Sequence, residues 1–226
     1  MTTEFGGGAD AAAPGAPVRV LPGADVDPSA RLGPGTTVWQ LAQVRENALL
    51  GRECTIGRGA YIGSAVVVGD RCKVQNHALV YEPAVLEDGV FVGPAAVLTN
   101  DQYPRAVTVD GRRKGGADWQ AVGVTLRTGA SIGARAVCVA PVTVGAWALV
   151  AAGAVVVHDV PDFALVAGTP ARRLGWVGRA GRPLVHDGHD RWSCPETGER
   201  YLETDGVLRL DQPPSSLDPP TGRLLA

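Results

Sequence analysis

The sequence has few cysteines, little net charge and no long apolar run, and each shortage excludes a class of protein. Four cysteines in 226 residues do not make a disulfide scaffold. A formal net charge of −2 leaves no basic footprint for a nucleic-acid partner. No apolar stretch is long enough to span a membrane, and the N-terminus lacks the basic and apolar regions of a secretion signal. We therefore expect a cytoplasmic protein that binds neither nucleic acid nor a membrane.

An internal repeat of six residues indicates the fold. An aliphatic residue occurs at every sixth position from Val26 to Leu98, and a second run with the same period extends from Leu126 to Val156. The fourth residue after each aliphatic is mostly small, and glycine often follows the aliphatic directly. The period matches neither an α-helix nor a flat strand, and a β-sandwich, the ordinary alternative, has no fixed six-residue register. We predict short straight segments joined by corners, with aliphatic and small residues pointing inward and glycine supplying the corner angles.

The pattern [LIV]-G-x-x-[small]-x resembles the hexapeptide repeat of left-handed parallel β-helix acyltransferases. In that family three hexads form one triangular coil, so the resemblance, over residues 26–176, implies an all-β prism of about six coils. The left-handedness comes from the family alone. The two runs are out of phase, which predicts an inserted loop at about residues 100–125 within a β-helix domain of residues 18–173. The resemblance also implies a homotrimer with active sites between neighbouring prisms.

A narrower resemblance concerns the substrate. Residues 74–101 and 104–106 resemble the N-acetyltransferases of nucleotide-linked 3-amino sugars, such as UDP-2-acetamido-3-amino-2,3-dideoxyglucuronate, and residues 145–176 are similar to the C-terminal part of the same family. The resemblance implies transfer from an acyl-CoA, expected to be acetyl-CoA, to the amine of such a sugar in the biosynthesis of a surface polysaccharide or a sugar-containing metabolite. Gln40 and Gln43 stand where relatives have histidine, which leaves the sugar open.

One hexad contains the candidate catalytic residues. By register Gln75, Asn76 and His77 lie on the outside. Several acyltransferases of this fold have a catalytic histidine at the position of Asn76, whereas the amino-sugar subgroup has asparagine. Asparagine cannot take the proton, but its amide oxygen can accept a hydrogen bond from the substrate amine and orient it. His77 is the competing candidate, as a base or a sugar ligand, although a solvated histidine is the simpler interpretation.

Further residues are assigned to the two substrates. Besides Gln75, the candidate contacts for the acceptor are Glu87, Asp88, Asn100, Asp101 and Arg105. A solvated acidic corner explains Glu87 and Asp88 equally well, whereas Arg105 suits a phosphate or carboxylate. For CoA, small residues could border the pantetheine arm and two arginines could meet the phosphates, namely Ala134, Ala151, Ala152, Gly153, Arg172 and Arg173.

The end of the chain departs from the hexad register. Residues 174–210 resemble the zinc-ribbon end of some relatives, but glycine, alanine and threonine replace three of the four cysteines and only Cys194 remains. We therefore expect a degenerate hairpin without metal. Residues 1–17 and 211–226 are predicted to be disordered tails. The other three cysteines fall on inward hexad positions, where they serve as small core residues.

Three alternatives remain. A zinc carbonic anhydrase shares the fold but needs three histidines, and only His77 and His158 lie within the predicted prism. A non-catalytic scaffold subunit would not need the Gln-Asn-His hexad. An acyltransferase for another small amine, such as an aminoglycoside, stays open.

Overall fold

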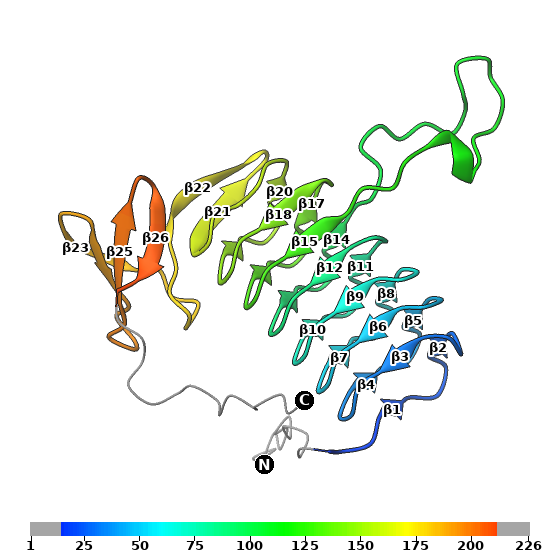
Figure 1. Ribbon diagram of the computed structural model, residues 1–226, viewed down its shortest axis with the longest axis horizontal. Coiled ribbons are helices and arrows are strands. Elements are labelled where there is room, and N and C mark those ends of the chain that lie inside the picture. The colour runs from blue at the N-terminus through cyan, green and yellow to red at the C-terminus, as the bar shows by residue number, and fades with distance from the viewer. Residues whose placement is uncertain (1–14, 212–226) are drawn as a thin grey trace, which may run out of the picture.

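The computed structural model describes residues 15–211 and confirms a parallel β-helix of stacked triangular coils (Figure 1). Face A contains β1 (Arg19–Val20), β4 (Thr37–Val38), β7 (Thr55–Ile56), β10 (Lys73–Val74), β13 (Phe91–Val92), β16 (Ser131–Ile132), β19 (Leu149–Val150), β21 (Ala164–Gly168) and β22 (Ala171–Trp176). Face B contains β2 (Asp25–Val26), β5 (Gln43–Val44), β8 (Tyr61–Ile62), β11 (Leu79–Val80), β14 (Val97–Leu98), β17 (Val137–Cys138) and β20 (Val155–Val156). Face C contains β3 (Arg31–Leu32), β6 (Leu49–Leu50), β9 (Val67–Val68), β12 (Val85–Leu86), β15 (Val124–Leu126) and β18 (Val142–Val144).

Each coil takes eighteen residues, so that Lys73 pairs with Phe91 in the next parallel strand of face A. The prediction of about six coils is too low. Face A has nine strands, of which β22 alone runs antiparallel to its neighbour. The additional turns come from β1, whose Val20 extends the first aliphatic run by one step of six, and from β21, which follows the end of the second run.

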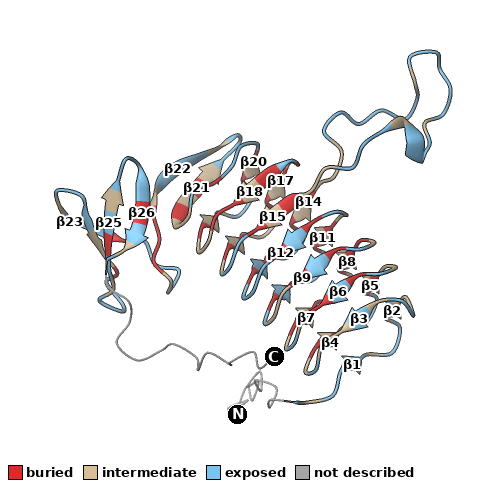
Figure 2. Ribbon diagram, in the orientation of Figure 1, coloured by how far each residue is buried: buried red, intermediate tan, exposed pale blue. Residues whose placement is uncertain are grey.

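The predicted inward positions form the core (Figure 2). In the hexad beginning at Val74, both Val74 and Ala78 are fully buried, whereas Asn76 and His77 are exposed. The aliphatics of the first coil, Val26 and Leu32, are only half-buried because no preceding coil covers them. Large and small side chains thus alternate around the inside of each coil, which suits the close packing of a narrow interior.

The glycines that follow the aliphatic residues do not supply the corner angles, as predicted from the sequence, but prevent a steric clash between neighbouring coils. The left-handed backbone angle occurs two residues later, at Gly59 (φ 65°) and also at non-glycine residues such as Asn47 (φ 58°). Gly57 has no such angle; instead, a Cβ atom there would lie 2.5 Å from the backbone nitrogen of Asn76 in the next coil. Glycine is needed because consecutive coils approach too closely for a side chain.

The strands are separated by three corners, which we call AB, BC and CA after the faces that they join. In the coil of β10–β12, these corners are residues 75–78, 81–84 and 87–90. The predicted insertion is confirmed as residues 99–123, and it leaves the prism at the BC corner with one short 3-10 helix, η1 (Gly116–Asp118) (Figure 1). Its two ends are joined by a hydrogen bond from the Val122 N–H to the Asn100 carbonyl, 3.1 Å long.

The C-terminal appendage is a four-stranded antiparallel sheet rather than a single hairpin. It consists of β23 (Val185–Gly188), β24 (Arg191–Ser193), β25 (Arg200–Thr204) and β26 (Val207–Leu210). Trp176 at the end of the prism and Trp192 of the sheet both donate to the Glu203 carboxylate, at 2.9 and 3.0 Å. The predicted tails lie outside the described residues except for residues 15–17 and 211. Within residues 15–211, no helix has the length and apolarity to cross a membrane.

Candidate active site

The residues predicted for the site lie on different corners of the prism. Asn76 and His77 share the AB corner with the four small residues predicted to border CoA. Glu87 and Asp88 are on the CA corner, whereas Asn100, Asp101 and Arg105 belong to the insertion on the BC corner. A single prism therefore brings Gln75 and the four small acyl-donor residues to the catalytic candidates. It separates them from the other predicted acceptor ligands, and Arg172 and Arg173 belong to β22 at the end of the prism.

The Asn76 side chain is exposed but already bonded. Its Oδ1 accepts a hydrogen bond from the backbone N–H of Arg58 in the preceding coil, at 2.9 Å. Asp70 and Asp88 make the same contact on the CA corner, to Arg52 and Asp70, at 2.8 Å in both cases. Asn76 thus belongs to a recurrent inter-coil bond, which leaves its Nδ2 group and the second lone pair of Oδ1 for a ligand.

His77 occupies the left-handed corner position, with φ 58°. Its backbone N–H donates to the Arg58 carbonyl at 2.9 Å. The imidazole ring lies over Gly59 of the preceding coil, where an added Cβ would be 2.5 Å from Nδ1. The ring is exposed and follows Asn76 directly in the chain, so both side chains lie on the AB corner of the same coil.

Further along the AB corner, two backbone N–H groups are open. Those of Ala134 and Ala152 have no hydrogen-bond partner within residues 15–211. The reason is visible in the sequence: the residue one coil after Ala134 is Ala152, which has no side-chain oxygen to accept the bond that Arg58 donates to Asn76. Ala134 lies two coils from Asn76, roughly 10 Å along the prism. Ala151 and Gly153 flank Ala152, so this edge presents backbone donors without bulky side chains.

Glu87 and Asp88 are engaged in contacts between coils. Glu87 Oε2 accepts from both the N–H and the hydroxyl of Thr128, at 2.8 Å, and these bonds lower the pKa of Glu87. Asp88 accepts from the Asp70 N–H and forms a 3.7 Å ion pair with Arg71. The geometry favours the interpretation of these carboxylates as parts of a structural corner.

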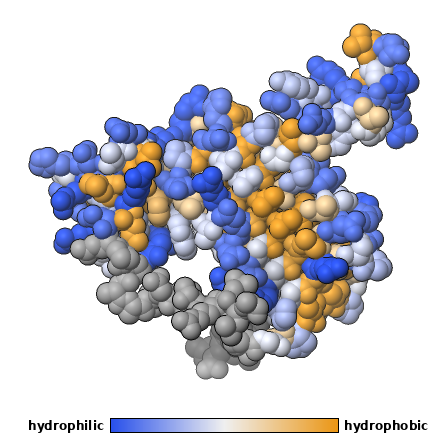
Figure 3. Space-filling model, in the orientation of Figure 1, coloured by the Kyte–Doolittle hydropathy of each residue, from blue (hydrophilic) through white to orange (hydrophobic). Residues whose placement is uncertain are grey.

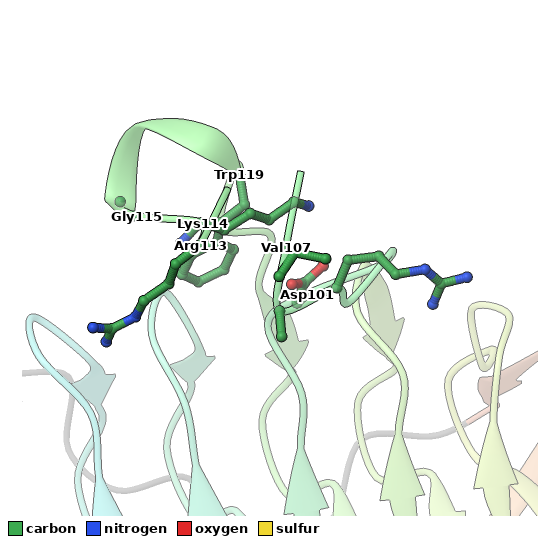
Figure 4. A pocket seen from close by; sticks show the side chains of 9 residues that line it. Asp101, Val107, Arg113, Lys114, Gly115 and Trp119 are labelled. Atoms are coloured by element: carbon green, nitrogen blue, oxygen red, sulfur yellow. The ribbon is translucent and has the colours of Figure 1, made fainter. Parts of the chain in front are cut away.

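The insertion forms its own hollow of about 640 Å³ (Figure 4). Asp101 Oδ1 caps the Tyr103 N–H at 2.9 Å, and Arg105 donates to the Pro104 carbonyl at 3.0 Å. The same hollow is lined by Trp119 and by two cations, Arg113 and Lys114, which the sequence favours as a solvated loop tip. In the run of three cations at residues 112–114, Arg112 alone is paired within the described residues, with Asp118 at 2.6 Å.

Arg172 and Arg173 lie beside the last coil and line a cavity of about 280 Å³ together with His158. Arg173 stacks on Trp176 at 4.3 Å and reaches Glu203 at 3.9 Å, so it connects the prism to the C-terminal sheet. The side chain of Arg172 is exposed and donates to the Ala171 carbonyl at 3.0 Å. Of the two, Arg172 is the better placed for an anionic ligand.

Comparison with known proteins identifies the repeat. The family model described as the hexapeptide repeat of succinyl-transferase matches residues 47–81 and 128–157. LpxA, a UDP-N-acetylglucosamine acyltransferase from Bacteroides fragilis, shares the fold with a TM-score of 0.57 at 17% identity, over 71% of this chain and 61% of that one. Two stretches of the chain thus match this hexapeptide repeat. The confirmed fold of this hexapeptide-repeat protein is therefore the left-handed parallel β-helix.

Two curated relatives of the hexapeptide-repeat protein differ in substrate. One is the dTDP-3-amino-3,6-dideoxy-alpha-D-galactopyranose 3-N-acetyltransferase of Aneurinibacillus thermoaerophilus, 41% identical over 83 residues, which are 37% of this chain and 42% of the relative. The other is the serine acetyltransferase of Escherichia coli strain K12, 39% identical over 88 residues, which are 38% of this chain and 31% of the relative. The chain spans less than half the length of these relatives.

The appendage of the hexapeptide-repeat protein has a polar network at the position of the lost zinc-ribbon ligands. A Cβ on Gly178 would lie 3.1 Å from the Tyr201 hydroxyl and 3.4 Å from Cβ of Cys194. Tyr201 donates to Glu199 at 2.7 Å, and Arg179 binds the same carboxylate at 2.5 Å. Within the described residues, no group of three or more His, Cys, Asp or Glu side chains could hold a metal ion.

Proposed function

We propose that this protein transfers the acetyl group of acetyl-CoA to the amine of a nucleotide-linked amino sugar, in the cytoplasm, where acetyl-CoA is available. The observation that supports it best is the AB corner, where Asn76 and His77 lie on the same edge as the open N–H groups of Ala134 and Ala152. Similarity to the 3-amino sugar N-acetyltransferase supports this choice of acceptor.

The mechanism follows from the donors and acceptors on this edge. CoA would lie along the corner, with its amide carbonyls accepting from the open N–H groups of Ala134 and Ala152. The free amine would donate a hydrogen bond to Asn76 and attack the thioester carbonyl, whose developing negative charge needs a nearby N–H donor. The C–N bond forms, the C–S bond breaks, and the surplus proton of the amine passes to the departing thiolate or to water.

A homotrimer would complete the site. The AB corner and the insertion lie on different corners of one prism, so one chain cannot enclose a ligand between them. In a three-fold ring each contact is heterologous, so one corner of a prism faces a different surface of its neighbour. Light scattering on active protein should give three times the chain mass; a stable, fully active monomer would contradict this arrangement.

The proposed reaction is tested by following free thiol release from acetyl-CoA. The acceptors would be dTDP- and UDP-linked 3-amino and 4-amino sugars, an aminoglycoside and L-serine, with the corresponding hydroxyl sugars as matched controls. We expect turnover with an amino-sugar nucleotide and none with its hydroxyl counterpart. Turnover of L-serine alone would instead favour the activity named for the second relative, and absence of acetyl-CoA binding would favour a scaffold.

A further inference from the structure

Glu82 on the BC corner has a carboxylate that the described part of the chain leaves without a partner. Its Oε2 is buried, and neither carboxylate oxygen makes a hydrogen bond or an ion pair with any residue in the range 15–211. Gly63 lies directly against Oε2, where any side chain would collide with it. Only Oε2 is enclosed, so the other oxygen remains accessible from outside the prism. One oxygen is thus fixed, while the other is presented to solvent.

The contrast with equivalent positions shows what is unusual. Glu82 occupies on its corner the hexad position of Asp70 and Asn76, whose shorter side chains accept the N–H of the residue one coil earlier, at 2.8 and 2.9 Å. The equivalent donor for Glu82 is the N–H of Ser64, to which it makes no hydrogen bond. A buried oxygen without a partner is costly, and its presence needs an explanation beyond the fold.

The surroundings of Glu82 suit a cation. The half-buried rings of Tyr61 and Tyr81 lie 5.1 Å apart, tilted by 46°. Burial raises the pKa of Tyr61, and the negative charge of Glu82 raises it further. The nearby guanidinium of Arg45 is already paired with Glu46 at 2.6 Å. An unneutralised carboxylate beside two aromatic rings attracts an ammonium group through both its charge and the ring faces.

The position of this cluster relates it to the acceptor. The insertion starts one coil after Tyr81, whose N–H faces the Leu98 carbonyl at 3.4 Å, and it returns at Gly123, where a Cβ would lie 2.6 Å from the Pro83 carbonyl. We propose that Glu82, Tyr61 and Tyr81 form an ammonium subsite that captures the protonated amine of the acceptor, which then releases one proton to water and attacks as the free amine. This rests on the proposed function, with the BC corner of one protomer facing the AB corner of the next.

The first test measures discrimination between an amine and a hydroxyl. Glu82→Gln is compared with Glu53→Gln, the same change on the CA corner. With dTDP-3-amino-3,6-dideoxygalactose, Glu82→Gln should raise KM about 10- to 100-fold with the KM for acetyl-CoA unchanged, because a charged hydrogen bond is lost. By calorimetry it should also lose the preference for the amino sugar over its hydroxyl counterpart. Glu53→Gln should behave like the wild type. An unchanged preference in Glu82→Gln would overturn the subsite.

Glu82→Asp separates ligand binding from folding. The shorter carboxylate should reach the Ser64 N–H as Asp70 reaches that of Arg52, so the melting temperature should rise while the amine preference falls as in Glu82→Gln. A variant that is more stable and yet binds the amine poorly cannot be explained by misfolding. Full amine affinity in Glu82→Asp would contradict the inference.

A probe that needs no turnover distinguishes failure of the subsite from failure of the proposed function. Cyclohexylammonium should shift the ring NMR signals of Tyr61 and Tyr81 in the wild type, whereas cyclohexanol should not, and Glu82→Gln should remove the response. If no amine is acetylated but this response is present, the proposed function fails and the subsite stands. If acetylation occurs and the rings do not respond to cyclohexylammonium, the subsite fails alone.

Discussion

The amide oxygen of Asn76 accepts the backbone N–H of Arg58, one coil earlier, at 2.9 Å. The residue in the position expected for catalysis therefore also joins two coils, in the same way as Asp70 joins its own coil to Arg52. A role in holding the prism together and a role in orienting the amine are superimposed in one side chain. They can be separated because aspartate preserves the first contact but places a negative charge beside the amine, which favours its unreactive ammonium form.

Asn76→Ala should lose both roles. We expect a loss of about 1 kcal/mol in the free energy of unfolding and a fall in kcat of roughly thirtyfold, which corresponds to about 2 kcal/mol of lost orientation. Asn76→Asp should retain the stability of the wild type, measured by chemical denaturation, and still lose activity in the thiol-release assay. Wild-type kcat in Asn76→Ala, with stability alone reduced, would show that Asn76 is structural only.

His77→Asn tests proton abstraction. Asparagine tolerates the left-handed angle at this position better than most residues, so the fold should be retained. If Asn76 orients a free amine, His77→Asn should keep kcat within a few-fold of the wild type. A loss of about 10²- to 10⁴-fold, with the pH profile of kcat also changed, would identify His77 as the general base instead.

Gly57→Ala should destabilise the prism. The added methyl group would lie 2.5 Å from the Asn76 nitrogen, and backbone cannot move aside as a flexible side chain can. Overpacking of this kind costs about 1–3 kcal/mol, which should appear in thermal melts as a lower midpoint. Gly116→Ala is the matched control, since a Cβ there meets nothing within 4 Å and no positive φ is involved. It should melt within about 0.5 kcal/mol of the wild type.

The C-terminal sheet should weaken in acid because of Glu199. Although burial acts to raise it, hydrogen bonds from Arg179 and Tyr201 hold the pKa of Glu199 below its ordinary value. The folded pKa is therefore below the unfolded one, so the stabilisation is complete above about pH 4.3 and is lost as pH falls through the folded pKa. Glu199→Gln should cost about 1–2 kcal/mol at pH 7 and remove part of the acid dependence. Denaturation followed by the fluorescence of Trp176 and Trp192 at several pH values measures both; an identical acid dependence in the variant would contradict this.

Activity should survive prolonged treatment with EDTA. The proposed acetyl transfer uses backbone N–H groups and an asparagine side chain, none of which needs a metal ion. The assay is thiol release before and after chelation, with zinc added back as the control. Loss of turnover on chelation and its recovery with zinc would show that the interpretation of Cys194 and its surroundings is wrong.

The sequence predicts the prism well because its core follows a local pattern that repeats every six residues. Each inward residue, such as Val74 or Ala78, is determined by its place in a six-residue unit, and burial follows directly. At the C-terminal end of the prism this six-residue pattern is interrupted, so the sequence predicts too few coils there. Between Val156 and Val166 the third strand of the coil is reduced to a single bridge, Val144 to Val160, so the period of six is interrupted although stacking continues.

The site was harder to predict because it depends on which residues lie one coil apart. The partner of Asn76 is Arg58, and the absence of a partner for Glu82 becomes apparent only when Gly63 and Ser64 are placed beside it. The hexad position shows that the Asn76 side chain points outward, but not that its Oδ1 already accepts a hydrogen bond. The separation of Glu87 from Asn76 likewise follows from the corners, which become evident once three strands are counted as one turn.

The insertion at residues 99–123 begins and ends at one corner, where Val122 bonds Asn100 and Gly123 packs above Pro83. Because β15 resumes the stack directly on β12, the prism has the same register that it would have without the intervening segment. The segment can therefore be replaced without disturbing the stacking of the coils. Replacing this segment should change what the BC corner can contact, while the stacking that presents the edge with Ala134 and Ala152 stays intact.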